Sequence, residues 1–156
     1  MNREILLIAE QLKDAYEGEP WFGRSIKEIF NEIDEATVFE KPGGQHSILE
    51  LLWHMITWRE FTLSRFRKDQ IPVEYFEKND WRELDHSDKA LWHQGLERFA
   101  KLHNELVEAI QQQKDEILSQ RVDDRKYDVR KLLYGIIQHD IYHLGQIAYV
   151  KKMLQE

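Results

Sequence analysis

The chain contains no cysteine among its 156 residues, and this absence excludes several kinds of site. Without thiolates the protein can form neither a disulfide framework nor a cysteine-ligated zinc or iron–sulfur centre, and it has no cysteine nucleophile. Any metal ion must therefore be held by histidine, carboxylate or water. At this length we expect one domain, residues 1–156, that buries its core without such cross-links.

Long hydrophobic runs and long basic tracts are also missing. The first residues, Met1 to Leu6, lack the apolar run of a signal peptide, and no later segment approaches the roughly 18 uncharged residues of a membrane span. We therefore expect a cytoplasmic protein without a membrane partner. The net charge of −7, with lysine and arginine interspersed among carboxylates, disfavours binding to a phosphate backbone, so nucleic acid is not an expected partner.

Helical periodicity recurs along the sequence and predicts four long helices. A serine followed three residues later by glutamate can form a capping box, and this pattern occurs at Ser25 and Ser47. The first capping box predicts a short helix to about Glu35, and Asp128 is a plausible N-cap of the last long helix. The predicted long helices run from Ile5 up to Gly18, from Ser47 to about Arg67, from about Asp88 to Gln113, and from Asp128 to about Leu154.

Four long helices without an alternating strand pattern predict an all-α fold, an up-and-down four-helix bundle. The segment from Lys68 to about His86 contains Ile71-Pro72 and scattered charges, which indicates a long crossover that Trp81 pins. The second long helix is apolar on most of its sides, including Trp53, Ile56 and Leu63. Such a helix is buried against other helices or a partner subunit, so we expect a homodimer.

Two histidines interrupt the core-facing stripe of the last helix. His139 and His143 are four residues apart, which places both imidazoles on one side of the helix, one turn apart. One helix can supply two nitrogen ligands to a single metal ion in this way. A buried histidine is, however, more often a hydrogen-bonded core residue than a ligand, so the spacing alone leaves both interpretations open.

A third ligand has to come from a facing helix, and two histidines qualify. His54 lies on an inward line of the second long helix with Leu51, Trp58 and Phe61, and His103 lies on a similar line of the third. A divalent ion would satisfy three polar rings that face one another in an apolar core. Periodicity does not choose between His54 and His103. The remaining histidines, in or beside loops and helix starts, are expected to be solvated: His46, His86 and His93.

Two other catalytic arrangements find little support. A di-iron carboxylate bundle needs a Glu-x-x-His motif on each of two core helices and two further glutamates, which the sequence does not supply. Asp140 to His143 is a near match, whereas Glu83 to His86 falls in the crossover. Ser-His-Asp catalysis is disfavoured because Ser25 and Ser47 serve as helix caps.

Three segments of the sequence form distinctive motifs: Gly18-Glu19-Pro20-Trp21-Phe22-Gly23 with Ser25-Ile26, Ser47-Ile48-Leu49-Glu50-Leu51-Leu52-Trp53-His54, and His139-Asp140-Ile141-Tyr142-His143-Leu144-Gly145-Gln146-Ile147. With these motifs the sequence resembles the DinB family of metal-binding four-helix bundles. The resemblance implies a DinB-type bundle in which His54, His139 and His143 bind nickel, zinc or a similar ion, and it sets His103 aside. Leu144 occupies a position that is often arginine in the family, so an anion-binding role of that arginine is not expected here.

The resemblance also implies a class of chemistry. Some members of the family are described as metal-dependent hydrolases and others as transferases that use a low-molecular-weight thiol. Three neutral imidazoles would leave the ion its full charge and an open position for water or a thiol. We therefore expect a metal-dependent enzyme on a small molecule, with thiol S-transfer ahead of hydrolysis and a non-catalytic metal-binding or stress-associated module as the alternative. Asp140 and Tyr142 are neighbouring candidates for substrate contacts.

Overall fold

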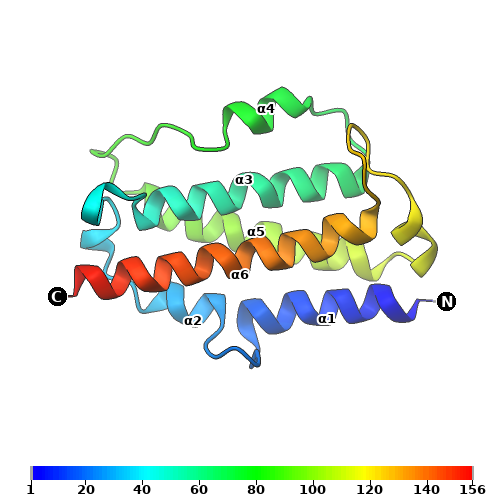
Figure 1. Cartoon of the computed structure of the whole chain (residues 1–156), viewed down its shortest axis with the longest axis horizontal. Helices are drawn as coiled ribbons and strands as arrows, with labels where there is room; N and C mark the ends of the chain where they lie inside the picture. The colour runs from blue at the N-terminus through cyan, green and yellow to red at the C-terminus, as the bar shows by residue number, and fades with distance from the viewer. Residues whose placement is uncertain (1, 156) are drawn as a thin grey trace.

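A computed structural model describes residues 2–155, and four long α-helices dominate it (Figure 1). No β-strand occurs in this part of the chain, so the predicted all-α fold is confirmed. None of the helices between residues 2 and 155 is both long and apolar enough to cross a bilayer. The long helices are α1 (Arg3–Glu17), α3 (Ile48–Arg67), α5 (Leu91–Gln111) and α6 (Val129–Leu154); the connections contain α2 (Ile26–Asn31), α4 (Val73–Lys78), and the 3-10 turns η1 (Glu35–Thr37), η2 (Pro42–Gly44) and η3 (Asp115–Ser119).

Three helices, α2, α3 and α6, begin at the caps that the sequence predicts. The Ser47 hydroxyl accepts a hydrogen bond from the Glu50 amide at 3.1 Å, and the Glu50 carboxylate accepts one from the Ser47 amide, which completes the predicted capping box. The Asp128 carboxylate caps α6 by accepting from the Lys131 amide at 2.9 Å. After the Ser25 cap, α2 is shorter than predicted, because it ends at Asn31 and a separate 3-10 turn follows.

The four long helices form a square in which α3 and α1 each pack against both α5 and α6. Ion pairs of Glu60 with Arg98 and of Arg67 with Glu105 rise in the same order along α3 and α5, so these two helices run in the same direction. The up-and-down order expected from the sequence is therefore not what the structure has. The chain leaves α3 at one end of the bundle and returns along its length through residues 68–90 before α5 begins (Figure 1).

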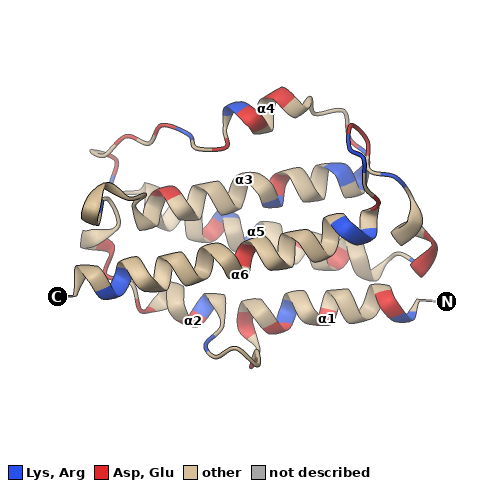
Figure 2. Cartoon of the chain, viewed as in Figure 1, with Lys and Arg blue, Asp and Glu red and all other residues tan. Residues whose placement is uncertain are grey.

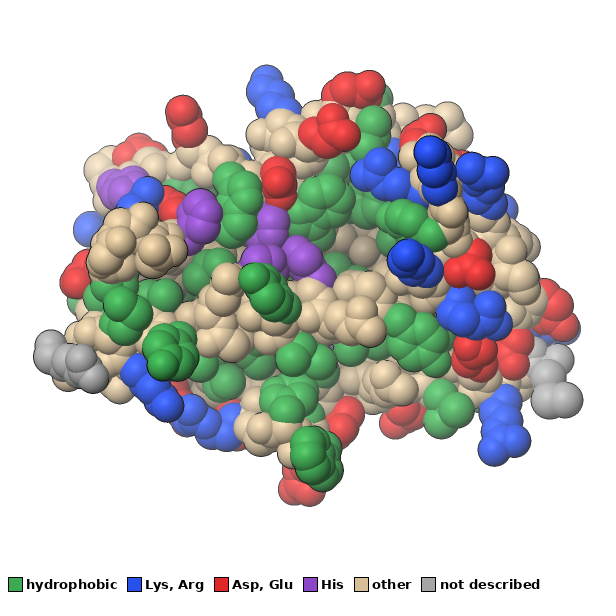
Figure 3. All heavy atoms as spheres, in the orientation of Figure 1, with side chains coloured by type: hydrophobic (Ala, Val, Ile, Leu, Met, Phe, Trp, Pro, Cys, Tyr) green, Lys and Arg blue, Asp and Glu red, His purple; other side chains and the backbone are tan. Residues whose placement is uncertain are grey.

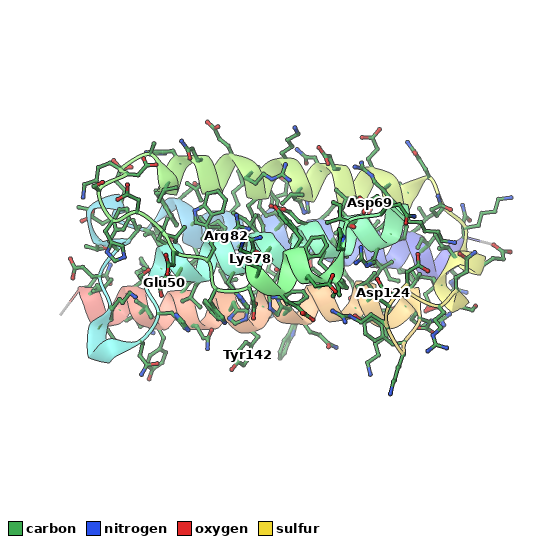
Figure 4. All side chains as sticks on the ribbon, turned by 90° about the horizontal axis from the view of Figure 1, so that it is seen from above. Glu50, Asp69, Lys78, Arg82, Asp124 and Tyr142 are labelled. Atoms are coloured by element: carbon green, nitrogen blue, oxygen red, sulfur yellow. The ribbon has the colours of Figure 1, made fainter. Side chains whose placement is uncertain are left out.

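The crossover covers the extra apolar face of α3. Phe76 of α4 is fully buried and its ring packs edge-on against Phe61 of α3, with ring centroids 5.3 Å apart. Figure 4 views the molecule from above and shows the crossover, with Lys78 and Arg82, lying along α3. Ile56 and Leu63 are buried within the single chain. The feature that suggested a homodimer is thus explained by one chain, and the dimer itself stays a prediction.

Apolar side chains from all four long helices make one buried cluster, but several polar side chains lie within it. Burial of a polar group is costly unless it has a partner, so these residues mark the places where the core does more than pack. The ionisable members are His54, Arg59, Arg65, His103, Asp140 and His143.

Candidate metal centre

Three histidines from two helices converge at the middle of the bundle. The Nε2 atom of His54 on α3 lies 3.1 Å from Nε2 of His139 and 3.0 Å from Nε2 of His143, both on α6. One ring nitrogen of each residue lies within 4.8 Å of the others, a spacing that could hold a metal ion. His54 and His143 are buried and His139 is half-buried, and Figure 3 shows histidine side chains gathered near the centre of one face.

The partners of the outer ring nitrogens fix the protonation of two of these rings. Nδ1 of His54 faces two acceptors of Asp80, the backbone carbonyl oxygen and a carboxylate oxygen, each at 2.9 Å. Nδ1 of His143 faces the side-chain oxygen of Gln146 at 2.6 Å. Each Nδ1 therefore donates a proton, so in a neutral ring Nε2 carries an unshared electron pair.

Two unshared pairs that face each other at 3.0 Å repel unless a proton or a metal cation lies between them. Burial disfavours the proton, because it lowers the pKa of His54 and of His143. Burial, with the repulsion of the neighbouring histidines, lowers the pKa of His139 to about 3. Three neutral imidazoles with converging Nε2 atoms, two of them with hydrogen-bonded outer nitrogens, are a donor set that a divalent transition metal prefers, so the residues fit such an ion.

The crossover contributes residues that hold the cluster in place. The indole ring of Trp81 stacks between His54 and His46, with centroid distances of 3.9 Å and 3.7 Å and nearly parallel planes. Its neighbour Asp80 also accepts a hydrogen bond from the Trp58 indole nitrogen at 2.6 Å. The prediction that Trp81 pins the crossover agrees with these contacts, and Asp80, which periodicity did not single out, positions His54.

His103 lies apart from the cluster, in a separate buried network. Nδ1 of His103 is 3.3 Å from a guanidinium nitrogen of Arg59, and the His103 ring lies against Tyr16 with centroids 4.2 Å apart. Arg59 also forms a buried ion pair with Asp140, with nitrogen–oxygen distances of 2.6 Å and 2.7 Å. His103 is thus a hydrogen-bonded core histidine.

The other residues singled out in the sequence lie outside the cluster. Asp140 points into the core toward Arg59, and Tyr142 is 65% exposed and points away from α6 (Figure 4). His93 pairs with Glu35 on the surface at 2.5 Å. His86 packs against Phe39, and both histidines are exposed, as is His46, in agreement with the prediction of solvated side chains.

The sequence analysis did not identify Arg59 as a buried polar residue, although its position in α3 indicates burial. It continues an apolar stripe of α3 at helical spacing, with Leu52, Ile56 and Leu63. An arginine at a core position needs a buried acceptor, and Asp140 occupies a core position on α6. The ion pair of Arg59 and Asp140 could be predicted only by comparing the buried stripes of α3 and α6.

The comparison with family models connects this geometry to known proteins. The model of the DinB superfamily matches residues 23–147. The chain belongs to the DinB superfamily. The match covers the converging histidines of α3 and α6 and the crossover between them, and it confirms the resemblance seen in the sequence motifs. No curated protein matches the chain.

One position separates this DinB protein from the pattern that the motifs suggested. Leu144, the residue at which the sequence departs from the family motif, is buried in the apolar core and is only 2% exposed. A leucine side chain at this buried position cannot bind an anion.

Proposed function

We propose that the protein binds one divalent transition-metal ion, nickel or zinc, through His54, His139 and His143. The observation that carries this proposal is the convergence of the three Nε2 atoms while Asp80 and Gln146 accept hydrogen bonds from the outer nitrogens of His54 and His143. Outer partners of this kind fix the ring orientation of histidine ligands in metalloproteins.

Metal content tests the proposal directly. Protein purified without an affinity tag should carry about one equivalent of metal per chain, and His143→Ala should lose most of it. His93→Ala is the matched control, because it removes an exposed histidine that lies outside the cluster. Equal metal in wild type and His143→Ala would contradict the proposal.

We further propose that the protein is a metal-dependent enzyme that acts on a small molecule, with thiol S-transfer favoured over hydrolysis. Three protein ligands support catalysis, because structural zinc sites are normally closed by four and this bundle has an extensive apolar core of its own. When bound, the ion would supply Lewis acidity, which lowers the pKa of water or of a thiol.

The carboxylates near the three histidines are already hydrogen-bonded or ion-paired, which favours the thiol reaction over hydrolysis. A hydrolase usually needs a carboxylate or histidine to take the proton of the attacking water. In the described part of the chain the nearest candidates are engaged: Asp80 accepts hydrogen bonds from His54 and Trp58, and Asp140 is paired with Arg59 inside the core. A thiol cosubstrate that the ion holds as its thiolate needs no separate strong base.

An activity screen separates the two reactions. Metal-loaded protein is assayed with glutathione, bacillithiol and mycothiol against monobromobimane, beside ester, amide and lactone substrates. Thiol-dependent turnover that is lost in His139→Ala and retained in His93→Ala supports the transferase, and thiol-independent cleavage with the same pattern supports the hydrolase. Equal rates for wild type and His139→Ala on every substrate would contradict catalysis and favour the non-catalytic metal-binding or stress-associated module.

Three further expectations belong to this proposal. A cytoplasmic location suits a thiol cosubstrate, because the cytoplasm keeps thiols reduced. Residues 1–156 act as one domain.

We also expect a homodimer. The exposed side chains of Tyr142, Tyr149 and Met153 along α6, and no longer those of α3, support this expectation. Light scattering at micromolar concentration tests it, and a monomeric mass would contradict it.

A further inference from the structure

A cavity of about 480 Å³ lies beside the histidine cluster, between α3, α6 and the segment that precedes α6. His139 belongs to both the cluster and the cavity wall. Figure 3 shows the surface hollowed next to the gathered histidines. Volumes of this size accommodate small-molecule ligands. The lining residues are Trp58, Phe61, Thr62, Tyr127, Lys131, Leu132, Tyr134, Gly135, Ile136, Gln138 and His139.

The walls of the cavity favour an apolar ligand body. Four aromatic side chains and two aliphatic ones supply most of the lining. Two polar atoms of the wall are already engaged elsewhere: the Trp58 indole nitrogen donates to Asp80, and the Thr62 hydroxyl donates to the Trp58 carbonyl oxygen at 2.8 Å. These residues therefore present carbon surface to a ligand, which burial of a phenyl ring or alkyl chain would stabilise.

The charge of the cavity is positive in a protein of net charge −7. No aspartate or glutamate lines it, and its one lysine, Lys131, has no ion-pair partner among residues 2–155. The Arg125 guanidinium, which is not part of the lining, lies 4.9 Å from the centre of the Phe61 ring in the wall. Figure 2 shows basic residues on the first turn of α6, at the end of α3 and in the loop before α6.

Lys131 and His139, the cation and the histidine of the cavity wall, are separated along α6. Lys131 and His139 are eight residues apart on α6, which corresponds to about 12 Å of helix axis. The flexible lysine side chain shortens this gap. A ligand that reaches both groups needs about the length of a phenyl ring with a short alkyl chain.

We propose that this cavity binds an amphipathic organic anion: an apolar aromatic or alkyl body, a carboxylate or sulfonate held by Lys131, and the reacting polar group directed toward His139. The last element rests on the proposed function, whereas the anion and the apolar body rest on the cavity alone.

Gly135 offers a way to close the cavity without disturbing the fold. It lies in the wall, and a Cβ atom built on it would meet no atom within 4 Å. A glycine inside a helix is less favourable than alanine by about 1 kcal/mol, so replacement by leucine should not weaken α6. Gly145 provides the matched control, because it is on the same helix, has the same open space and does not line this cavity.

The test compares 4-phenylbutyrate with the uncharged 4-phenylbutanol by calorimetric titration of the full chain, once loaded with zinc and once treated with chelator. We expect the acid to bind at least about tenfold more tightly than the alcohol, as a charge-assisted contact provides. Lys131→Met should weaken the acid about tenfold and leave the alcohol unchanged. Gly135→Leu should abolish binding of both, and Gly145→Leu should bind both as wild type does.

Equal affinity of acid and alcohol for wild type, no binding of the acid at millimolar concentration, or unchanged binding by Gly135→Leu would each overturn the proposal. The chelator arm separates this proposal from the metal site. If the chelator-treated protein binds the acid and the metal analysis finds no metal in the purified protein, the cavity proposal is supported and the metal proposal is refuted. A protein that carries metal but fails to bind the acid would refute the cavity and leave the metal proposal standing.

Discussion

His54 donates its Nδ1 proton to Asp80, which lies 26 positions later in the chain and offers both its carbonyl oxygen and its carboxylate at 2.9 Å. The crossover, and not the helix that carries His54, therefore determines which nitrogen of the ring faces the other two histidines. A loop that covers the apolar face of α3 also orients a candidate ligand. The candidate metal site is completed only when the crossover packs against α3.

Removal of the Asp80 carboxylate should weaken metal binding. We expect Asp80→Ala to lower the affinity about tenfold, at the lower end of the range for outer hydrogen-bond partners, because the backbone carbonyl of residue 80 remains as an acceptor. Competition with a coloured chelator measures the affinity. Glu77→Ala, an exposed acidic residue of the same crossover, is the control. The same affinity for both variants would show that the carboxylate does not orient His54.

Removal of the metal should lower stability without unfolding the bundle. A ligand at one hundred times its dissociation constant stabilises the folded state by about 2.7 kcal/mol, so chelation should lower the melting temperature. The helical circular-dichroism signal at room temperature should stay, because one apolar cluster joins all four long helices. Loss of that signal on chelation would mean that the ion is structural.

The helices of this protein could be predicted from the sequence more completely than its site. Ser47 and Asp128 cap α3 and α6 through local hydrogen bonds, which a local pattern records. His54 and His103 could not be separated by periodicity, because both lie on buried stripes and both find polar partners. The partners that distinguish them, the other histidines for His54 and Arg59 for His103, lie on other helices.

The direction of α5 shows the same limit. Amphipathic periodicity indicates which face of a helix is buried, but it does not indicate whether two neighbouring helices run parallel or antiparallel. The crossover is long enough to return along the bundle, so α5 runs parallel to α3, and residues 80 and 81 of that return segment contact His54. Local spacing could not have placed Asp80 or Trp81 against the cluster.

Breaking the buried pair of Arg59 and Asp140 should be costly. Both side chains are 1% exposed, and removal of one partner leaves the other charge unpaired in the core, which typically costs about 3–5 kcal/mol. We expect Arg59→Met to destabilise the protein by about this amount. The double variant Arg59→Met with Asp140→Leu should recover a large part, since no unpaired charge remains. Urea denaturation in chelator measures both, and equal stability of the single and double variants would contradict the explanation.

His103 should make stability depend on pH. Burial and the nearby Arg59 charge lower the pKa of His103 to about 3 in the folded protein, whereas an unfolded histidine titrates near pH 6.5. Below about pH 6.5 His103 binds a proton in the unfolded chain but stays neutral in the folded protein. The contribution of His103 to stability is therefore complete above that pH and falls as the pH drops toward about 3.

In His103→Gln, which cannot titrate, the free energy of unfolding should decline less steeply between about pH 7.5 and about pH 4.5. Urea denaturation of chelator-treated protein gives these slopes. His93→Gln, a change at a solvent-exposed histidine outside this buried network, is the control for the substitution itself. If wild type and His103→Gln decline in parallel, His103 binds its proton equally in both states, and its hydrogen bond to Arg59 does not hold it neutral.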